Sequence, residues 1–139
     1  MEQDIIRSLV WAGKAVRELA APPFAELGLH PGQNVLLEAL WEQDGQTPGE
    51  LAARMRVAVP TAVRMAQRME ATGLVTRTPD QDDRRLVRIG LTDRGRQLRE
   101  PLSAVRRQLS RTALAGIDEA EQRALGQTLL KVLANLGRT

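Results

Sequence analysis

The feature that most constrains this fold is the stretch from 74 to 91, where two short apolar segments flank a charged turn. Residues 74–76 (LVT) favour a strand and directly follow Gly73, a residue typical of a helix end. In residues 87–91 (VRIGL) the apolar side chains alternate with others, so they share one face of a second strand. We therefore expect a β-hairpin with a turn of six or seven residues.

Helical patterns lie on both sides of this hairpin. Apolar residues recur at spacings of three and four, and capping residues precede several of the segments. The expected helices are 4–20, 31–42, 47–55, 58–72, 93–115 and a last one that begins after Asp118. Ala21-Pro22-Pro23 is expected to end the first helix, and Pro101 to kink or break the long one. The central order, two helices and then a hairpin, is that of a helix-turn-helix with a β wing.

Charge is distributed unevenly along the chain. Residues 54–111 carry fourteen arginines against six acids, whereas residues 1–53 carry three basic residues against eight acids. A basic central segment is typical of a surface that binds a polyanion. An arginine-rich chain with solvated helix faces would show the same imbalance, so charge alone leaves both interpretations open.

Composition excludes several classes of protein. Without cysteine, the chain has no disulfides, no cysteine-based metal sites and no thiol switch, which is consistent with a cytoplasmic protein. We expect no membrane-spanning helix and no export signal, because no apolar run is long enough and the first residues carry acids. A single histidine, no glycine-rich phosphate loop and no metal-ligand spacing predict that the chain is not an enzyme and needs no metal or cofactor.

Three stretches form one pattern over most of the chain: LHPGQNVLLEAL (29–40), GELAARMRVAVPTAVRMAQRMEATGLVTR (49–77) and DRRLVRIGLTDRG (83–95). In these stretches the chain resembles the MarR family of winged helix-turn-helix transcription regulators. The resemblance implies a mainly α fold with a small β-hairpin wing. Its winged lobe (29–95) would join dimerisation helices from the N-terminal (1–28) and C-terminal (96–139) segments within one structural domain.

The second helix of a helix-turn-helix lies in the major groove of DNA. Here we expect that helix to present Pro60, Thr61, Arg64, Gln67 and Arg68 to DNA. Thr61 is suited to a phosphate, whereas Arg64 and Gln67 are long enough to reach base edges. Members of the family often carry serines at the start of this helix, where this chain has Ala58 and Val63.

The wing supplies a second expected contact, from Arg84, Arg85 and Arg88. An arginine at a wing tip can enter the minor groove, where the potential is most negative over narrow A·T tracts. By resemblance, Asp83 holds Arg85 and Arg85 enters the groove. Arg84 is adjacent and suited to the same role, so the sequence leaves open which of the two arginines enters.

The resemblance also implies a small-molecule site between the dimerisation helices and the DNA-binding lobe. Trp11, His30 and Trp41 are its expected residues, and the favoured alternative for any one of them is that it fills core or interface. The expected function is a homodimeric repressor that binds a pseudo-palindromic operator in double-stranded DNA and is released by a small lipophilic or phenolic ligand. The alternative is a winged-helix module that binds protein and not DNA.

Overall fold

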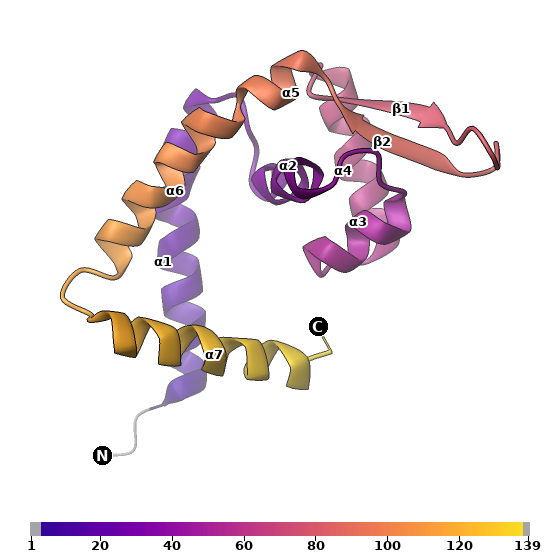
Figure 1. Cartoon of the computed structure of the whole chain (residues 1–139). Coiled ribbons are helices and arrows are strands. Elements are labelled where there is room, and N and C mark those ends of the chain that lie inside the picture. The colour runs from indigo at the N-terminus through magenta and orange to yellow at the C-terminus, as the bar shows by residue number, and fades with distance from the viewer. Residues whose placement is uncertain (1–3, 138–139) are drawn as a thin grey trace.

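The computed structural model describes residues 4–137, so the first three and last two residues of the expected terminal segments lie outside it. The elements are α1 (Ile5–Glu26), α2 (Gln33–Glu42), α3 (Pro48–Met55), α4 (Val59–Ala71), β1 (Val75–Pro79), β2 (Val87–Leu91), α5 (Asp93–Gln97), α6 (Arg99–Ala113) and α7 (Glu119–Asn135). Figure 1 shows α2, α3, α4 and the hairpin gathered into one lobe, with α1, α6 and α7 beside it. The mainly helical fold with one antiparallel hairpin confirms the predicted fold class. No helix in the described part of the chain is long and apolar enough to cross a membrane.

An aliphatic core holds the lobe together. Its fully buried side chains come from every element of the lobe and include Leu36, Leu37, Leu40, Leu51, Met69, Leu74 and Ile89. Helical spacing predicts Val35, Leu36, Ala39 and Leu40 as the inner face of α2. This is only partly right, because Leu37 is fully buried whereas Val35 is 36% exposed. The helix is enclosed on two sides by other elements, so its buried surface is wider than a single stripe.

The hairpin has the expected form and an additional partner. Strands β1 and β2 pair antiparallel, with Val75 opposite Leu91 and Pro79 opposite Val87. Gln46, just before α3, exchanges two backbone hydrogen bonds with Ile89, at 3.1 and 2.8 Å. The buried Gln46 side chain also donates to the Ala39 carbonyl oxygen at 2.9 Å. These bonds attach the base of the wing to the segment between α2 and α3, which the sequence pattern did not predict.

Prolines have opposite effects in the two long helices. Pro22 and Pro23 were expected to end the first helix, and this was wrong, since α1 continues through them to Glu26. The two missing amide donors weaken the helix locally, but continuing it buries Phe24 in the core. The expected break near Pro101 is confirmed: α5 ends and α6 begins around Leu98. Pro101 cannot donate to the carbonyl of residue 97 and its ring clashes with that group.

A junction between residues 72–74 and 92–95 connects the end of α4 to the start of α5. Thr92 donates from Oγ1 to the Gly73 carbonyl oxygen at 2.6 Å and accepts from the Gly95 N–H at 3.1 Å. The Trp41 indole N–H donates to the Gly95 carbonyl oxygen at 3.0 Å. A Cβ on Gly95 would collide with the Leu74 carbonyl oxygen. Only glycine therefore allows α5 to approach this closely.

The outer helices expose apolar surface. The apolar stripe expected along the last helix is present in sequence, yet α7 buries none of its residues within the single chain. Leu130 and Leu136 are 55% and 68% exposed, and Ile5 and Ile6 of α1 are 67% and 70% exposed. These side chains form an apolar surface on two amphipathic helices that the single chain leaves uncovered.

We predict that Gly95→Ala lowers the free energy of unfolding by about 1–3 kcal/mol, because the added methyl group forces α5 away from Leu74. Urea unfolding followed by circular dichroism measures the change. Gly49→Ala is the matched control, since a Cβ there lies 4.0 Å from Thr47 Oγ1 and contacts nothing closer. The control should be neutral or stabilising by up to about 1 kcal/mol. Equal effects of the two substitutions would contradict the close approach at the junction.

Candidate nucleic-acid interface

Helix α4 has two faces of opposite character. Ala62, Ala66 and Met69 are fully buried against the lobe core, and the two alanines let the backbone lie close to it. The opposite face carries the residues that the sequence predicts to contact DNA, of which Thr61 is half-buried and the exposed ones are Pro60, Arg64, Gln67 and Arg68. Side chains of this length on an exposed helix face are suited to reach base edges in a groove.

The start of α4 lacks a hydroxyl cap. Ala58 is the N-cap residue and makes no side-chain hydrogen bond to the helix, while Val63 is half-buried. By contrast, Thr47 caps α3 by accepting the Glu50 N–H at 3.2 Å. The only hydroxyl in the first turn of α4 is that of Thr61, so cationic side chains dominate the outward surface of this helix.

Two arginines on α4 keep their charge free for a partner. Within residues 4–137, Arg64 and Arg68 make no ion pair and no side-chain hydrogen bond. By contrast, two arginines on other elements of the lobe are paired with acids. Arg77 Nη2 of β1 lies 3.1 Å from Glu70 Oε1, and Arg54 Nη1 of α3 lies 2.9 Å from Glu42 Oε2. The free guanidinium groups are thus on the helix face that the helix-turn-helix geometry turns toward DNA.

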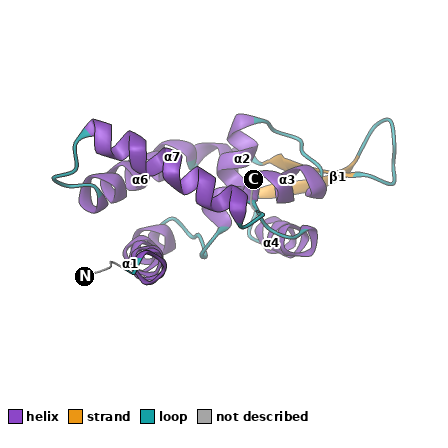
Figure 2. Ribbon diagram, turned by 90° about the horizontal axis from the view of Figure 1, so that it is seen from below, coloured by secondary structure: helices purple, strands orange, loops and turns teal. Residues whose placement is uncertain are grey.

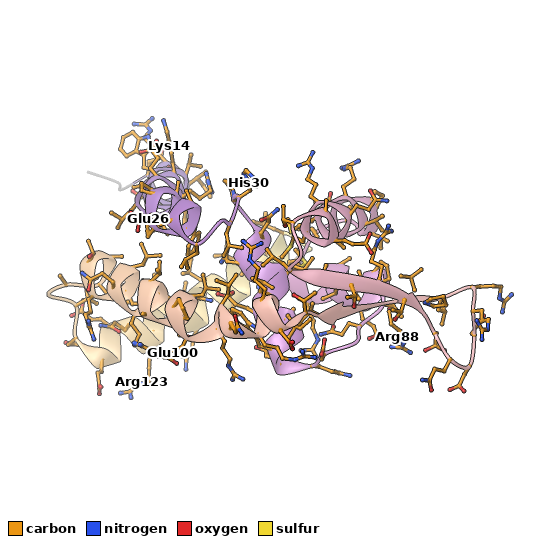
Figure 3. The ribbon with its side chains drawn as sticks, turned by 90° about the horizontal axis from the view of Figure 1, so that it is seen from above. Lys14, Glu26, His30, Arg88, Glu100 and Arg123 are labelled. Carbon is orange, nitrogen blue, oxygen red and sulfur yellow. The ribbon has the colours of Figure 1, made fainter. Side chains whose placement is uncertain are left out.

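The base of the wing is held by a clamp between Asp80 and Arg88. Arg88 Nε donates to Asp80 Oδ1 at 2.8 Å, and its Nη1 donates to the Gly45 carbonyl oxygen at 3.2 Å. Arg88 Nη1 also lies 3.6 Å from Glu50 Oε1, at the start of α3. Figure 3 shows Arg88 along the hairpin, short of its tip. Arg88, which the sequence predicts to contact DNA, is thus bonded within the chain in this structure: its side chain, 36% exposed, connects the wing to α3.

The same clamp shifts the acid–base equilibria of its members. The Arg88 guanidinium, followed by the Asp83 N–H, lowers the pKa of Asp80, and the Asp82 N–H adds to this effect. Asp80 in turn raises the pKa of Arg88. Both shifts favour the charged forms, as expected for a hydrogen-bonded ion pair. The turn therefore contains a fixed carboxylate that organises the backbone of residues 80–83.

At the wing tip, Asp83 holds Arg85 as the sequence predicts. The Asp83 carboxylate accepts from Arg85 Nε at 3.1 Å, from Nη2 at 3.2 Å and from the Arg85 backbone N–H at 3.1 Å. These bonds lower the pKa of Asp83, the side-chain bond most strongly. The Arg85 side chain is still 91% exposed. Arg84 is also exposed and has no ion pair within the described chain. Two arginines therefore project from this tip: Arg85 is held by Asp83, and Arg84 is not.

A cavity of about 810 Å³ opens between α1, α2 and α6. Its lining is mostly apolar, with Val16, Phe24, Leu29, Val35 and Leu109 among its residues. Two arginines also line it, Arg17 and Arg106, and Arg106 Nη1 lies 2.7 Å from Glu38 Oε1 of α2. The cavity is thus bordered by α2 of the lobe and by two of the three helices beside the lobe, α1 and α6.

None of the three residues expected at a ligand site lines this cavity. Trp11 is 63% exposed on α1, with the Arg7 guanidinium 5.8 Å from its ring centre. His30 points outward from the connection between α1 and α2 (Figure 3). Trp41 donates its indole N–H to the α4–α5 junction. Val35, an apolar residue just beyond the buried stripe of α2, was a better indication in the sequence of where the cavity lies.

No group of three or more histidine, cysteine, aspartate or glutamate side chains in the described chain is arranged to hold a metal ion. The acids of the wing, Asp80 and Asp83, are bonded to Arg88 and Arg85. These acids therefore hold arginine side chains in place, and positioned arginines suit the recognition of an anionic partner.

An acid titration of the wing tests the clamp. Because Arg88 stabilises the carboxylate of Asp80, the folded pKa lies below the ordinary value of 3.8. The stabilisation is therefore present above that value and is lost as the pH falls through the lowered pKa. We expect the Asp80 carboxylate carbon to titrate by NMR with a midpoint below 3.8, and Arg88→Gln to raise this midpoint. Arg84→Gln removes the same charge from the wing and should change the midpoint much less; an equal change would contradict a direct clamp.

Known proteins share this sequence pattern and architecture. The MarR family model matches residues 29–87. The uncharacterized HTH-type transcriptional regulator YybA of Bacillus subtilis (strain 168) is 24% identical over 135 residues, which cover 97% of this chain and 90% of YybA.

Two solved structures extend the similarity to nearly the whole chain. A putative MarR family transcriptional regulator from Listeria monocytogenes, complexed with 26mer DNA, has a TM-score of 0.87 at 26% identity and covers 97% of this chain and 90% of its own. CouR from Rhodococcus jostii RHA1, bound to p-coumaroyl-CoA, has a TM-score of 0.84 at 27% identity and covers 94% of this chain and 92% of its own. Together with the winged lobe and its basic helix, these similarities show that the chain belongs to the MarR family of transcription regulators.

Proposed function

We propose that this regulator is a homodimer that binds a pseudo-palindromic site in double-stranded DNA, represses transcription there, and is released by a small lipophilic or phenolic ligand. The observation that carries the DNA-binding part is the exposed face of α4, where Arg64 and Arg68 have no ion pair with any residue from 4 to 137. The regulator from Listeria monocytogenes that was solved with 26mer DNA supports this reading, since its architecture is the same.

The two parts of the interface suit two grooves. With α4 in the major groove, Arg64 is suited to a bidentate contact with guanine and Gln67 to one with adenine, while Thr61 is suited to a phosphate. The wing then lies toward the flanking minor groove, where Arg84 and Arg85 are the available cations. In this arrangement Asp83 restrains Arg85 before binding, so less side-chain freedom is lost when the contact forms.

The exposed apolar faces of α1 and α7 support a dimer. Figure 2 shows α1 set to one side of the lobe, and α7 has no buried residue in the single chain. A second copy would supply the same two faces, which is how a two-fold symmetric interface forms. Such a dimer presents two α4 helices to successive major grooves, about 10 bp apart, and therefore reads a pseudo-palindrome.

The cavity between α1, α2 and α6 is the site that we propose for the ligand. Its apolar lining suits a lipophilic or aromatic body, and Arg17 and Arg106 suit a polar or anionic group at its edge. Because α2 belongs to the lobe and α6 leads toward the dimer helices, a ligand between them can favour one spacing of the two lobes. It lowers DNA affinity if that spacing does not fit the operator. CouR, whose structure holds p-coumaroyl-CoA, supports a ligand with an aromatic part.

Binding to a duplex from the gene's own upstream region tests the DNA-binding role. Fluorescence anisotropy should show tight binding that weakens steeply with salt, by about 0.9 in the log–log slope for each phosphate neutralised. Arg64→Ala should weaken binding by about tenfold or more, since it removes a base contact worth about 1–3 kcal/mol. Arg85→Ala should weaken binding by about tenfold, since charge-assisted hydrogen bonds contribute about 1.5–3 kcal/mol.

Arg111→Gln, at the far end of α6, removes the same charge away from the interface and is the matched control. It should bind nearly as tightly as the parent chain. If Arg64→Ala and the control bind equally well, α4 does not read the major groove. If the parent binds no duplex at low salt, the protein-binding alternative is the better interpretation.

Sedimentation equilibrium tests the dimer. The parent chain should sediment as a dimer, whereas Ile6→Glu and Leu130→Glu should shift it toward the monomer, because each places a charge in the proposed apolar interface. Leu86→Glu is the control, since Leu86 is a large exposed side chain, 43% exposed, on the wing. A monomeric parent, or a loss of dimer in the control alone, would contradict the interface on α1 and α7.

A further inference from the structure

Arg56, in the turn between α3 and α4, has a left-handed backbone conformation with φ 60° and ψ 42°. The six other residues with positive φ in the described chain are all glycines. The Cβ atom makes this region unfavourable for other residues, which is why glycine is the usual choice there. At one position only, within residues 4–137, the chain places a long cationic side chain where it elsewhere uses glycine.

The turn itself requires the conformation but not the arginine. The Arg56 N–H donates to the Ala53 carbonyl oxygen at 3.3 Å, and the Val57 N–H donates to the Ala52 carbonyl oxygen at 3.0 Å. This pair of bonds is the Schellman motif that ends many helices, with glycine as its most common left-handed residue. Val57 completes the motif by packing against the core. Glycine at position 56 would therefore serve the fold better than arginine.

The guanidinium of Arg56 has no internal role in the structure. Within residues 4–137 it makes no ion pair and no hydrogen bond, and the residue is partly exposed. Arg54, two positions earlier, shows the contrast, since it donates to Glu42 and to Gln43, both at 2.9 Å. The charge of Arg56 thus remains available to a partner, and within residues 4–137 no contact of the guanidinium offsets the backbone strain that glycine would avoid.

The position of this turn identifies the partner. In a helix-turn-helix the first helix crosses the DNA backbone and the second enters the major groove, so the turn between them lies close to phosphates. We propose that Arg56 is an additional DNA contact, whose guanidinium binds a backbone phosphate beside the groove that α4 occupies. This inference rests on the proposed DNA-binding function. The Schellman turn fixes the direction of the Arg56 Cα–Cβ bond, which reduces the freedom lost on binding.

Two substitutions separate the contact from the fold. Arg56→Gly removes the charge and relieves the backbone, so it should unfold at a higher urea concentration than the parent. Arg56→Asn also removes the charge, while asparagine tolerates the left-handed conformation without the flexibility of glycine. Both should weaken binding to the upstream duplex by about tenfold, because a charge-assisted hydrogen bond is lost. Both should also lower the magnitude of the salt slope by about 0.9 for each phosphate contact.

Arg56→Lys and Arg111→Gln are the controls. Lysine keeps the point charge that a phosphate recognises and should retain most of the affinity, and Arg111→Gln loses one charge far from the turn and should bind like the parent. A glycine variant that is more stable yet binds DNA less tightly supports the contact. Unchanged affinity and salt slope in the glycine and asparagine variants would overturn it. A lower urea midpoint of unfolding in both variants would also overturn it, because the Arg56 side chain would then be stabilising the turn. Failure of the parent to bind any duplex refutes the proposed function itself, and this contact with it.

Discussion

The orientation of α4 depends on the close approach of α5 to the carbonyl of Leu74, which Gly95 makes possible. The hydrogen bonds from Thr92 to Gly73 and from Trp41 to Gly95 fix the same junction from two sides. Because α5 leads directly into α6, the junction sets the angle between the DNA-binding helix and the helix that reaches the proposed dimer interface. The proposed dimer, which places two α4 helices at a defined spacing, needs such a fixed connection, and a flexible linker here would leave the spacing undefined.

Charge in this chain is divided between holding the structure and meeting a partner. Asp80 binds the Arg88 side chain and Asp83 binds that of Arg85, and both ion pairs shape the wing. Exposed ion pairs of this kind contribute little to stability, so their effect is chiefly geometric. On α4 the pattern is the opposite, since Arg64 and Arg68 have no internal acid within the described chain. These two charges lie on the face that the helix-turn-helix geometry turns toward DNA.

Local patterns in the sequence were sufficient for much of this structure. The hairpin, the caps at Thr47 and Asp118 and the break near Pro101 each involve residues close in sequence. The Asp83–Arg85 pair is also local, and it was expected from the resemblance to the family. The wrong or missed features depend on contacts between distant segments. The helix α1 passes Pro22 because Phe24 reaches a core built from other helices, and Arg88 turns inward to Gly45 and Glu50. The cavity lies between three helices, and no single stretch of sequence reveals it.

In the proposed complex, two copies of α4 and of the wing contact successive turns of one DNA duplex. Hydroxyl-radical and methylation footprinting on the gene's upstream region reports these contacts base by base. We expect two protected major-groove patches about 10 bp apart, each flanked by a protected minor groove where a wing lies. A single protected patch, uniform protection along the duplex, or protection at the major grooves without the flanking minor grooves would contradict it.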